Sequence, residues 1–206
     1  MAVTSANRAL TILILFDAFV VGGVLMGFEM LGSRYLFPYF GGGIGTWAAL
    51  ISTVLCALAI GYFAGGAVVD RYHSARIIAA AILIAAAYLA LVPATADAVM
   101  AHILASIGDG PAAILVASAA LLLVPLSLLG TFSPVSVGLL TRSAEESGGV
   151  AGMVYGISTI GNVVGTLVTT FLLIPTIGSR SITYLYAVVL ALCAALLFLP
   201  VARKSP

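Results

Sequence analysis

Six polar side chains gather on one face of a long apolar segment, residues 150–175. If the segment is a helix, they fall within an arc of about 120° at 100° per residue. They are Tyr155, Ser158, Thr159, Asn162, Thr166 and Thr169. So narrow a polar stripe predicts contact with other protein or with a water-filled cavity. Two interpretations stay open: the stripe lines a polar substrate path with Asn162 near the bilayer midplane, or it holds a helix bundle together by interhelical hydrogen bonds.

Asp17 and Glu29 are the acidic residues that lie inside apolar segments. A charge buried there without a partner is costly, so each is a candidate for the substrate path. Asp17 has no evident partner and is the stronger candidate to bind a cation or a proton. Glu29 precedes Arg34 by five residues. We expect these two to form an ion pair that fixes the helix end, with a place on the substrate path as the alternative for both.

Motifs of catalysis are not found in the sequence. It has no Gly-rich nucleotide loop after a strand, no His/Cys set at metal-binding spacing, and no nucleophile paired with a His base. We therefore expect that this chain is not an enzyme and that it needs no cofactor or metal. A net charge of +1 gives no indication of nucleic-acid binding.

Composition indicates that these residues lie in membrane helices. Hydrophobic residues make up 63% of the chain and charged residues 7%, against about 25% charged in soluble domains. Runs of this length and polarity fit only helices in lipid. We predict one all-α integral membrane domain over residues 1–206 with six transmembrane helices, at about 9–31, 46–69, 76–93, 111–132, 150–175 and 181–201.

The first run contains Asp17 and lacks a clear small-x-small cleavage site, so we interpret it as a retained span and not a signal peptide. Basic residues set the orientation, because cytoplasmic connections carry an excess of Lys and Arg. With the N-terminus inside, six of the eight basic residues fall on the cytoplasmic side: Arg8, Arg71, Arg76, Arg142, Arg203 and Lys204. Both termini should then be cytoplasmic. Residues 94–110 should form an outer connection, either a short amphipathic helix or an ordered loop.

The two halves of the chain resemble each other weakly, since a Pro- and Gly-marked break follows the first span and again the fourth. Three spans are an odd number, so two such repeats would be inverted in the membrane, as in many secondary transporters. Four Gly-x-x-x-Gly pairs should allow close helix packing. They are Gly23/Gly27, Gly61/Gly65, Gly152/Gly156 and Gly161/Gly165.

A motif series runs from Glu29 to Arg71: Glu-x4-Arg, Pro-x-Phe-Gly, Trp, and Gly-x3-Asp-Arg. Its positions are occupied here by Glu29, Arg34, Pro38, Phe40, Gly41, Trp47, Gly66, Asp70 and Arg71. A second series in the fifth span is occupied by Asn162, Gly165, residues 171–175 and Gly178. Both series resemble the membrane region of bacterial fused MFS/spermidine synthases.

The resemblance implies half of a twelve-helix major-facilitator-like transporter in the bacterial cytoplasmic (inner) membrane. It also implies that Gly66 permits tight helix contact and that Asp70 and Arg71 form part of a cytoplasmic charge latch. The chain departs from the pattern after Arg71, where residues 72–75 replace the usual Gly and basic cluster. It also ends without the soluble aminopropyltransferase-like domain of the fused proteins.

Two functions are expected from this resemblance. The first is a half-size, homodimerising transporter-like unit that moves a small polar or cationic molecule such as a polyamine. The alternative is a non-transporting membrane subunit that docks a separately encoded spermidine-synthase-like enzyme through residues 142–149, Arg203 and Lys204. Both rest on analogy with a family and not on a site.

Overall fold

The computed structural model describes residues 5–198 of the chain, and this part is helical throughout. Its elements are α1 (Ser5–Phe40), α2 (Ile44–Val69), α3 (Ala75–Ile107), α4 (Pro111–Gly130), α5 (Phe132–Leu140), η1 (Ala144–Glu146), α6 (Ser147–Val168), η2 (Thr169–Leu173), α7 (Ile174–Thr176) and α8 (Ser179–Leu197). They form six helical runs long and apolar enough to cross a membrane, because α4 continues into α5, and η1, α6, η2 and α7 form one run. The prediction of six membrane helices is confirmed.

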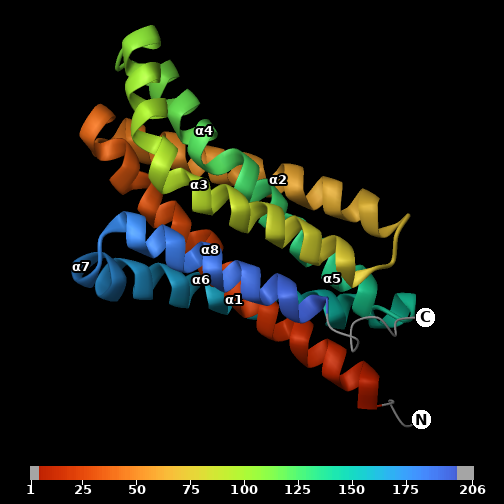
Figure 1. The fold of residues 1–206 in the computed structure, drawn as a ribbon. Coiled ribbons are helices and arrows are strands. Elements are labelled where there is room, and N and C mark those ends of the chain that lie inside the picture. The colour runs from red at the N-terminus through yellow and green to blue at the C-terminus, as the bar shows by residue number, and fades with distance from the viewer. Residues whose placement is uncertain (1–4, 199–206) are drawn as a thin grey trace.

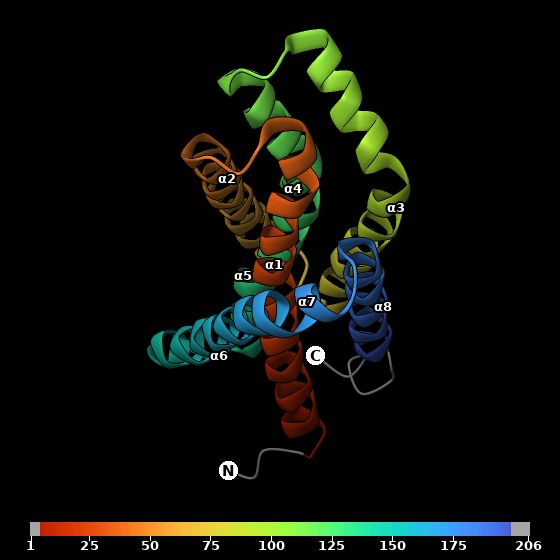
Figure 2. The same cartoon turned by 90° about the vertical axis from the view of Figure 1, so that its left-hand side faces the viewer.

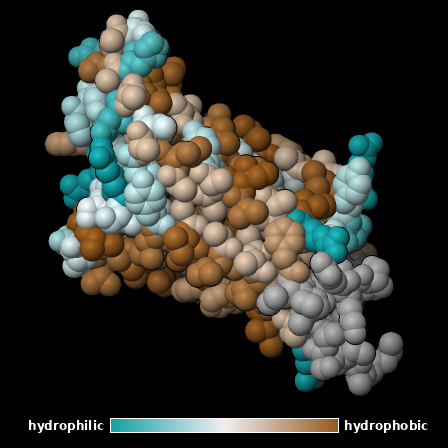
Figure 3. All heavy atoms as spheres, viewed as in Figure 1, coloured by the Kyte–Doolittle hydropathy of each residue, from teal (hydrophilic) through white to brown (hydrophobic). Residues whose placement is uncertain are grey.

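The surface has the polarity that a bilayer requires. On the face drawn in Figure 3, apolar residues form a broad band and hydrophilic residues gather at the ends. Large side chains such as Phe63 (82% exposed) and Phe171 (75% exposed) project from the helices with no protein over them. Such exposure fits a lipid-covered surface, and the chain is a multi-pass membrane protein.

The helices pack in three main pairs: α1 with α6, α2 with α4, and α3 with α8. Figure 2 shows α2 and α6 on one side, α1 and α4 in the middle, and α3 and α8 on the other side. The core lies among α1, α3 and α4, where Phe28, Ile82 and Leu122 are fully buried. By contrast, Val154 and Gly161 are the buried residues of α6, which is the least covered of the spans.

Glycines set two close helix crossings. A Cβ atom at Gly161 would overlap the Phe19 carbonyl of α1, and one at Gly165 would overlap Gly23. Likewise, a Cβ at Gly61 of α2 would overlap the Ser127 carbonyl of α4. Small residues are required at these points because the helix backbones themselves are in contact.

Gly65 meets Thr131 in the same way at the α2–α4 crossing, and the two crossings use corresponding positions. Gly161 and Gly165 stand 100 residues after Gly61 and Gly65. Ser127 and Thr131, which meet Gly61 and Gly65, stand 108 residues after Phe19 and Gly23, which meet Gly161 and Gly165. Exchanging the first three spans for the last three therefore carries one crossing onto the other.

We expected residues 94–110 to form either a short surface helix or an ordered loop, and the structure contradicts both expectations. The segment continues α3 as far as Ile107, and the connection to α4 is only residues 108–110. Pro93 does not end the helix, because a membrane helix tolerates the loss of one backbone hydrogen bond. Ala96 and Met100 beyond it are buried. Figure 1 shows the end of α3 and the start of α4 projecting together beyond the rest of the bundle.

The beginning of α1 and the end of α8 lie at the same end of the bundle, together with the α2–α3 connection (Figure 1). The α1–α2 and α3–α4 connections lie at the opposite end. An even number of spans requires this arrangement, and we call the second end the outer end, following the basic-residue prediction.

Candidate functional site

Two cavities lie among α1, α2 and the fifth span. The central cavity, of about 30 Å³, sits where the two glycine crossings meet. Its lining residues are Val21, Gly22, Leu25, Leu58, Tyr62, Leu129, Gly130, Phe132, Ser133, Ser158 and Asn162. The outer cavity, of about 310 Å³, lies nearer the outer end. Its lining residues are Met30, Ser33, Arg34, Phe37, Gly42, Trp47, Thr170 and Ile174.

Asn162 is the polar centre of the central cavity. With its amide nitrogen turned toward α1, it donates hydrogen bonds to the Gly22 carbonyl at 2.8 Å and to the Ser158 carbonyl at 3.3 Å. This orientation is the one that pairs donor with acceptor. A volume of about 30 Å³ holds roughly one water molecule. The central cavity is therefore a polar constriction and not a chamber for a solute.

The threonines of the polar stripe are satisfied within the protein. Thr159 and Thr166 donate to carbonyls four residues earlier, those of Tyr155 (2.8 Å) and Asn162 (2.9 Å). Thr169 bonds to the Gly165 carbonyl and to the Tyr186 hydroxyl of α8. Of these bonds, only that of Thr169 to Tyr186 joins two helices as the bundle-holding interpretation requires, whereas Thr159 and Thr166 bond within their own helix. Ser158 and Asn162 line the central cavity, and Thr166 lines neither cavity.

Tyr155 lies beside the central cavity's rim. Its ring meets Tyr62 of α2 edge to face, with 6.1 Å between ring centroids and 87° between planes. Both tyrosines are more than a third exposed. The pair links α2 to α6 beside the central cavity, on the side of the molecule that these two helices share.

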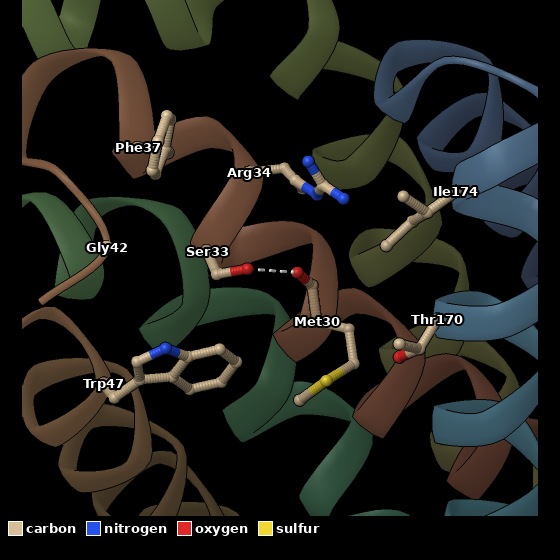
Figure 4. Close-up of a pocket in the computed structure, with 8 residues that line it drawn as sticks. All are labelled: Met30, Ser33, Arg34, Phe37, Gly42, Trp47, Thr170 and Ile174. Carbon is tan, nitrogen blue, oxygen red and sulfur yellow. Dashed lines mark hydrogen bonds between the residues drawn. The ribbon is translucent and has the colours of Figure 1, made fainter. Parts of the chain in front are cut away.

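The outer cavity is shaped by the outer ends of three spans. Arg34 extends across it toward Ile174, while Trp47 lies on the opposite side below Ser33 (Figure 4). The Ser33 hydroxyl is already used, since it donates to the Met30 carbonyl at 2.8 Å. Arg34 makes no ion pair or side-chain hydrogen bond to any residue that the structure describes. It is the free cation of the outer cavity.

Thr170 enters the outer cavity from η2, a single turn of π-helix. The turn ends two residues before Pro175, which has no N–H to donate and whose ring crowds the carbonyl of Phe171, four residues earlier and within the turn. The Thr170 hydroxyl is buried without a hydrogen-bond partner in the described chain. Such π-turns are frequent at functional sites.

Glu29 and Arg34 do not pair, so the expected ion pair is wrong. Glu29 is 7% exposed and lines neither cavity, whereas Arg34 is exposed. Their five-residue spacing on α1 separates the side chains by about 140° around the helix, too far for a neighbour contact. Within residues 5–198, the ion pair that is formed joins Arg180 of α8 to Asp97 of α3.

Asp17 is fully buried, but it does not share a path with Asn162. It faces α8, where the Cys193 thiol, at most a weak donor, lies beside its carboxyl. Apart from this thiol, neither carboxyl oxygen has a hydrogen-bond partner among the described residues. Gly22, which meets Asn162, is five residues further along α1 and so points about 140° away from Asp17.

The segment with Gly66, Asp70 and Arg71 differs from what the resemblance implies. No atom lies within 4 Å of a Cβ built at Gly66, so this glycine makes no tight contact; Gly65 makes it instead. Asp70 and Arg71 are exposed, and neither pairs with another described residue. The two charges therefore do not form a latch within residues 5–198.

Several cavity residues were not predicted from the sequence. Tyr62 stands 100 residues before Asn162, the same separation as between the glycines of the two crossings. Trp47 belongs to the motif series without an assigned role. Thr170 was not part of the predicted stripe, and it lines the cavity from within the π-turn. The chain matches no known protein family, no curated protein and no solved structure.

Proposed function

We propose that this protein is a transporter-like unit that moves a small polar molecule across the membrane. The observation that carries the proposal is the placement of the central cavity. Polar groups from α2, α5 and α6 converge there, at the junction of the two glycine crossings. The outer cavity lies among the same α1, α2 and fifth-span elements, so the polar groups form one series from the outer end to the bundle centre.

We further propose a 3+3 inverted repeat that corresponds to half of a major-facilitator-like transporter. The matched crossings support it, because Gly61/Gly65 and Gly161/Gly165 have equivalent roles. The third main helix pair, α3 with α8, is carried onto itself by the same exchange of halves. In transporters built this way, substrate sites lie at the interface between repeats.

A homodimer is the form in which this unit would transport. The constriction in one copy is too small for a solute, so a path of sufficient width needs a second surface. The α2 and α6 side offers that surface, since Tyr62, Tyr155 and Ile160 there are exposed. Two copies facing each other across this side would enclose the tyrosines and both cavities between them.

Following the resemblance, the protein would lie in a bacterial inner membrane with both termini cytoplasmic. The resemblance alone suggests a polyamine as substrate. The alternative function, docking of a separate spermidine-synthase-like enzyme, would use the exposed segment 142–149. Arg203 and Lys204, the other part of that expected surface, lie outside the described residues.

Uptake into proteoliposomes tests the transport proposal. Radiolabelled polyamines, amino acids and organic acids are offered to vesicles that contain the wild type, Asn162→Leu or Thr159→Val. We expect a substrate whose uptake Asn162→Leu abolishes while the protein stays folded, because Leu has a similar volume but no amide.

Thr159→Val is the matched control, since Thr159 is exposed and bonds only to its own helix. It should transport normally. Equal uptake per folded molecule by Asn162→Leu and the wild type would contradict the assignment. Uptake of none of the compounds, together with capture of a soluble synthase by residues 142–149, would favour the docking alternative.

A further inference from the structure

We propose that the outer cavity binds a small organic acid, with its carboxylate on Arg34 and its apolar body against Trp47. This inference rests on the proposed transport function in one respect, because it takes the bound acid to be the class of substrate that the protein moves. It replaces the cationic substrate suggested by the resemblance with an anionic one. Four features of the cavity lead to this assignment.

The first feature is charge. Arg34 is the charged residue among those that line the cavity, and no carboxylate faces it. The nearest acid along α1, Glu29, lines neither cavity, and Asp97 is engaged with Arg180. A guanidinium binds a carboxylate through two parallel N–H···O bonds, which makes an acid its best complement. A polyamine would meet this positive charge with no acidic group on the walls to offset it.

The second feature is the start of α2. Gly42 lies just before this helix, Trp47 closes its first turn, and both line the cavity. The first N–H groups of a helix have no acceptor within the helix and carry a partial positive charge. The free N–H groups of Ile44 and Gly45 do not line the cavity, so the start of this 26-residue helix adds only its partial positive charge to the field of Arg34.

The third feature is Thr170 on the opposite wall. Its hydroxyl oxygen is buried and has no partner among the described residues, although the other threonines of the fifth span are bonded. A buried hydroxyl without a partner is costly. The Thr170 hydroxyl would have to rotate about χ1 to reach the cavity, and a ligand oxygen that then accepted from it would remove this cost.

The fourth feature is the remaining wall, formed by Met30, Phe37, Trp47 and Ile174. These side chains offer no hydrogen-bonding group except the indole N–H. A bare inorganic anion would leave them facing empty space, whereas an organic acid with an aromatic or branched body would cover them. At about 310 Å³ the cavity is at the small end of ligand-binding sites.

Trp47 is the single tryptophan of the chain, so intrinsic fluorescence reports directly on this cavity. Purified protein in a non-ionic detergent is titrated with benzoate, with benzylamine as the same ring carrying a positive charge, and with inorganic phosphate. We expect benzoate to change the emission saturably and the other two probes to have no saturable effect. Arg34→Gln should weaken benzoate binding about tenfold or more, and Thr170→Val should weaken it less.

Arg180→Gln is the control, because it removes an exposed arginine at the same end of the molecule that does not line the cavity. It should bind benzoate like the wild type. Thermal melting of each variant shows whether it is folded, and Arg34→Lys, which keeps the charge, should bind better than Arg34→Gln. Saturable binding of benzylamine or spermidine with none of benzoate would overturn the proposal. So would a response to phosphatidylglycerol micelles with none to benzoate, which would assign Arg34 to lipid headgroups.

Uptake of benzoate by proteoliposomes separates this inference from the transport proposal. Binding that depends on Arg34 without uptake of any compound would support the site and contradict transport. Uptake of a cation by a protein that does not bind benzoate would support transport and contradict the site.

Discussion

Polar side chains in this bundle are of two kinds, and burial alone does not separate them. Thr159 and Thr166 donate their hydroxyl hydrogens to carbonyls of their own helix and have no donor left for a ligand or a neighbour. Asn162 donates a hydrogen bond from its amide nitrogen to the Gly22 carbonyl of α1, across the crossing. Asp17 and Thr170 keep buried oxygens that no described backbone or hydroxyl group satisfies. Ser118 and Ser136 also keep buried hydroxyls without a partner among the described residues, so such a group marks a functional candidate only where it carries a charge, as Asp17 does, or borders a cavity, as Thr170 does.

At the scale of the residue, we predict that Asp17→Asn leaves thermal stability unchanged or raises it. The amide has the same shape as the carboxyl but carries no charge into an apolar site, where an unpaired charge costs about 3 kcal/mol on insertion scales. Melting temperature in detergent is the measurement. If Asp17 binds the coupling cation or proton, the same variant should also lose the dependence of uptake on that ion.

Ser118→Ala provides the comparison, since Ser118 is another fully buried polar residue whose hydroxyl has no partner among the described residues. It should keep both its stability and its ion dependence. A fall of more than about 2 kcal/mol in the stability of Asp17→Asn would mean that the carboxylate has a favourable partner, contrary to its surroundings here.

At the scale of the element, the two glycine crossings decide how the helices meet. Gly165→Ala should destabilise the protein by about 1–3 kcal/mol, because its Cβ would overlap the Gly23 backbone and force α1 and α6 apart. Gly152→Ala is the matched control on the same helix, since no atom lies within 4 Å of its Cβ. It should be neutral or slightly stabilising. Chemical unfolding monitored by circular dichroism measures both, and equal losses would contradict the crossing.

The proposed repeat makes a second prediction at this scale. Gly65→Ala in α2 should cost about as much as Gly165→Ala in α6, because the two residues have equivalent roles. Gly66→Ala, one position further on, should change stability by less than about 0.5 kcal/mol, since its Cβ would meet open space. A larger loss at Gly66 than at Gly65 would restore the role that the resemblance assigns to Gly66.

At the scale of the whole molecule, orientation can be tested at the two ends of the bundle. A reporter fused after Pro206 should be cytoplasmic, and a reporter inserted at residues 108–110 should be outside. The expectation rests on the positive-inside bias, since six of the eight basic residues would be cytoplasmic in this orientation. Finding both reporters on one side would contradict the six-span topology.

The dimer is also a property of the whole molecule. Native mass spectrometry in mild detergent should show a concentration-dependent dimer of the wild type. Ile160→Trp, which enlarges an exposed residue of α6, should reduce it. Val188→Trp should leave the dimer unchanged, because Val188 is about equally exposed but lies on α8, on the side away from α2 and α6 (Figure 2). A monomer at every concentration, or equal effects of the two substitutions, would count against an interface on the α2 and α6 side.

The sequence by itself determined the number of spans and their helical nature, because lipid leaves a long apolar chain no alternative to the helix. The four-residue spacing pointed to the glycines of both crossings, but it was wrong for Gly152 and Gly156, where no described atom lies within 4 Å of a built Cβ. The sequence did not determine which face of each helix would meet which neighbour. Helical periodicity specifies the angle of a side chain about its own axis and nothing about the helix that lies opposite.

Only the tertiary structure decided the questions that depend on that opposite helix. It turned Asp17 toward α8 and Asn162 toward α1, although both had seemed to belong to one path. It left Arg34 free of Glu29 and placed Arg34 and Thr170, from two different spans, at the same cavity. Contacts of this kind arise where helices far apart in the sequence cross, and the crossing points are set by the packing of the whole bundle.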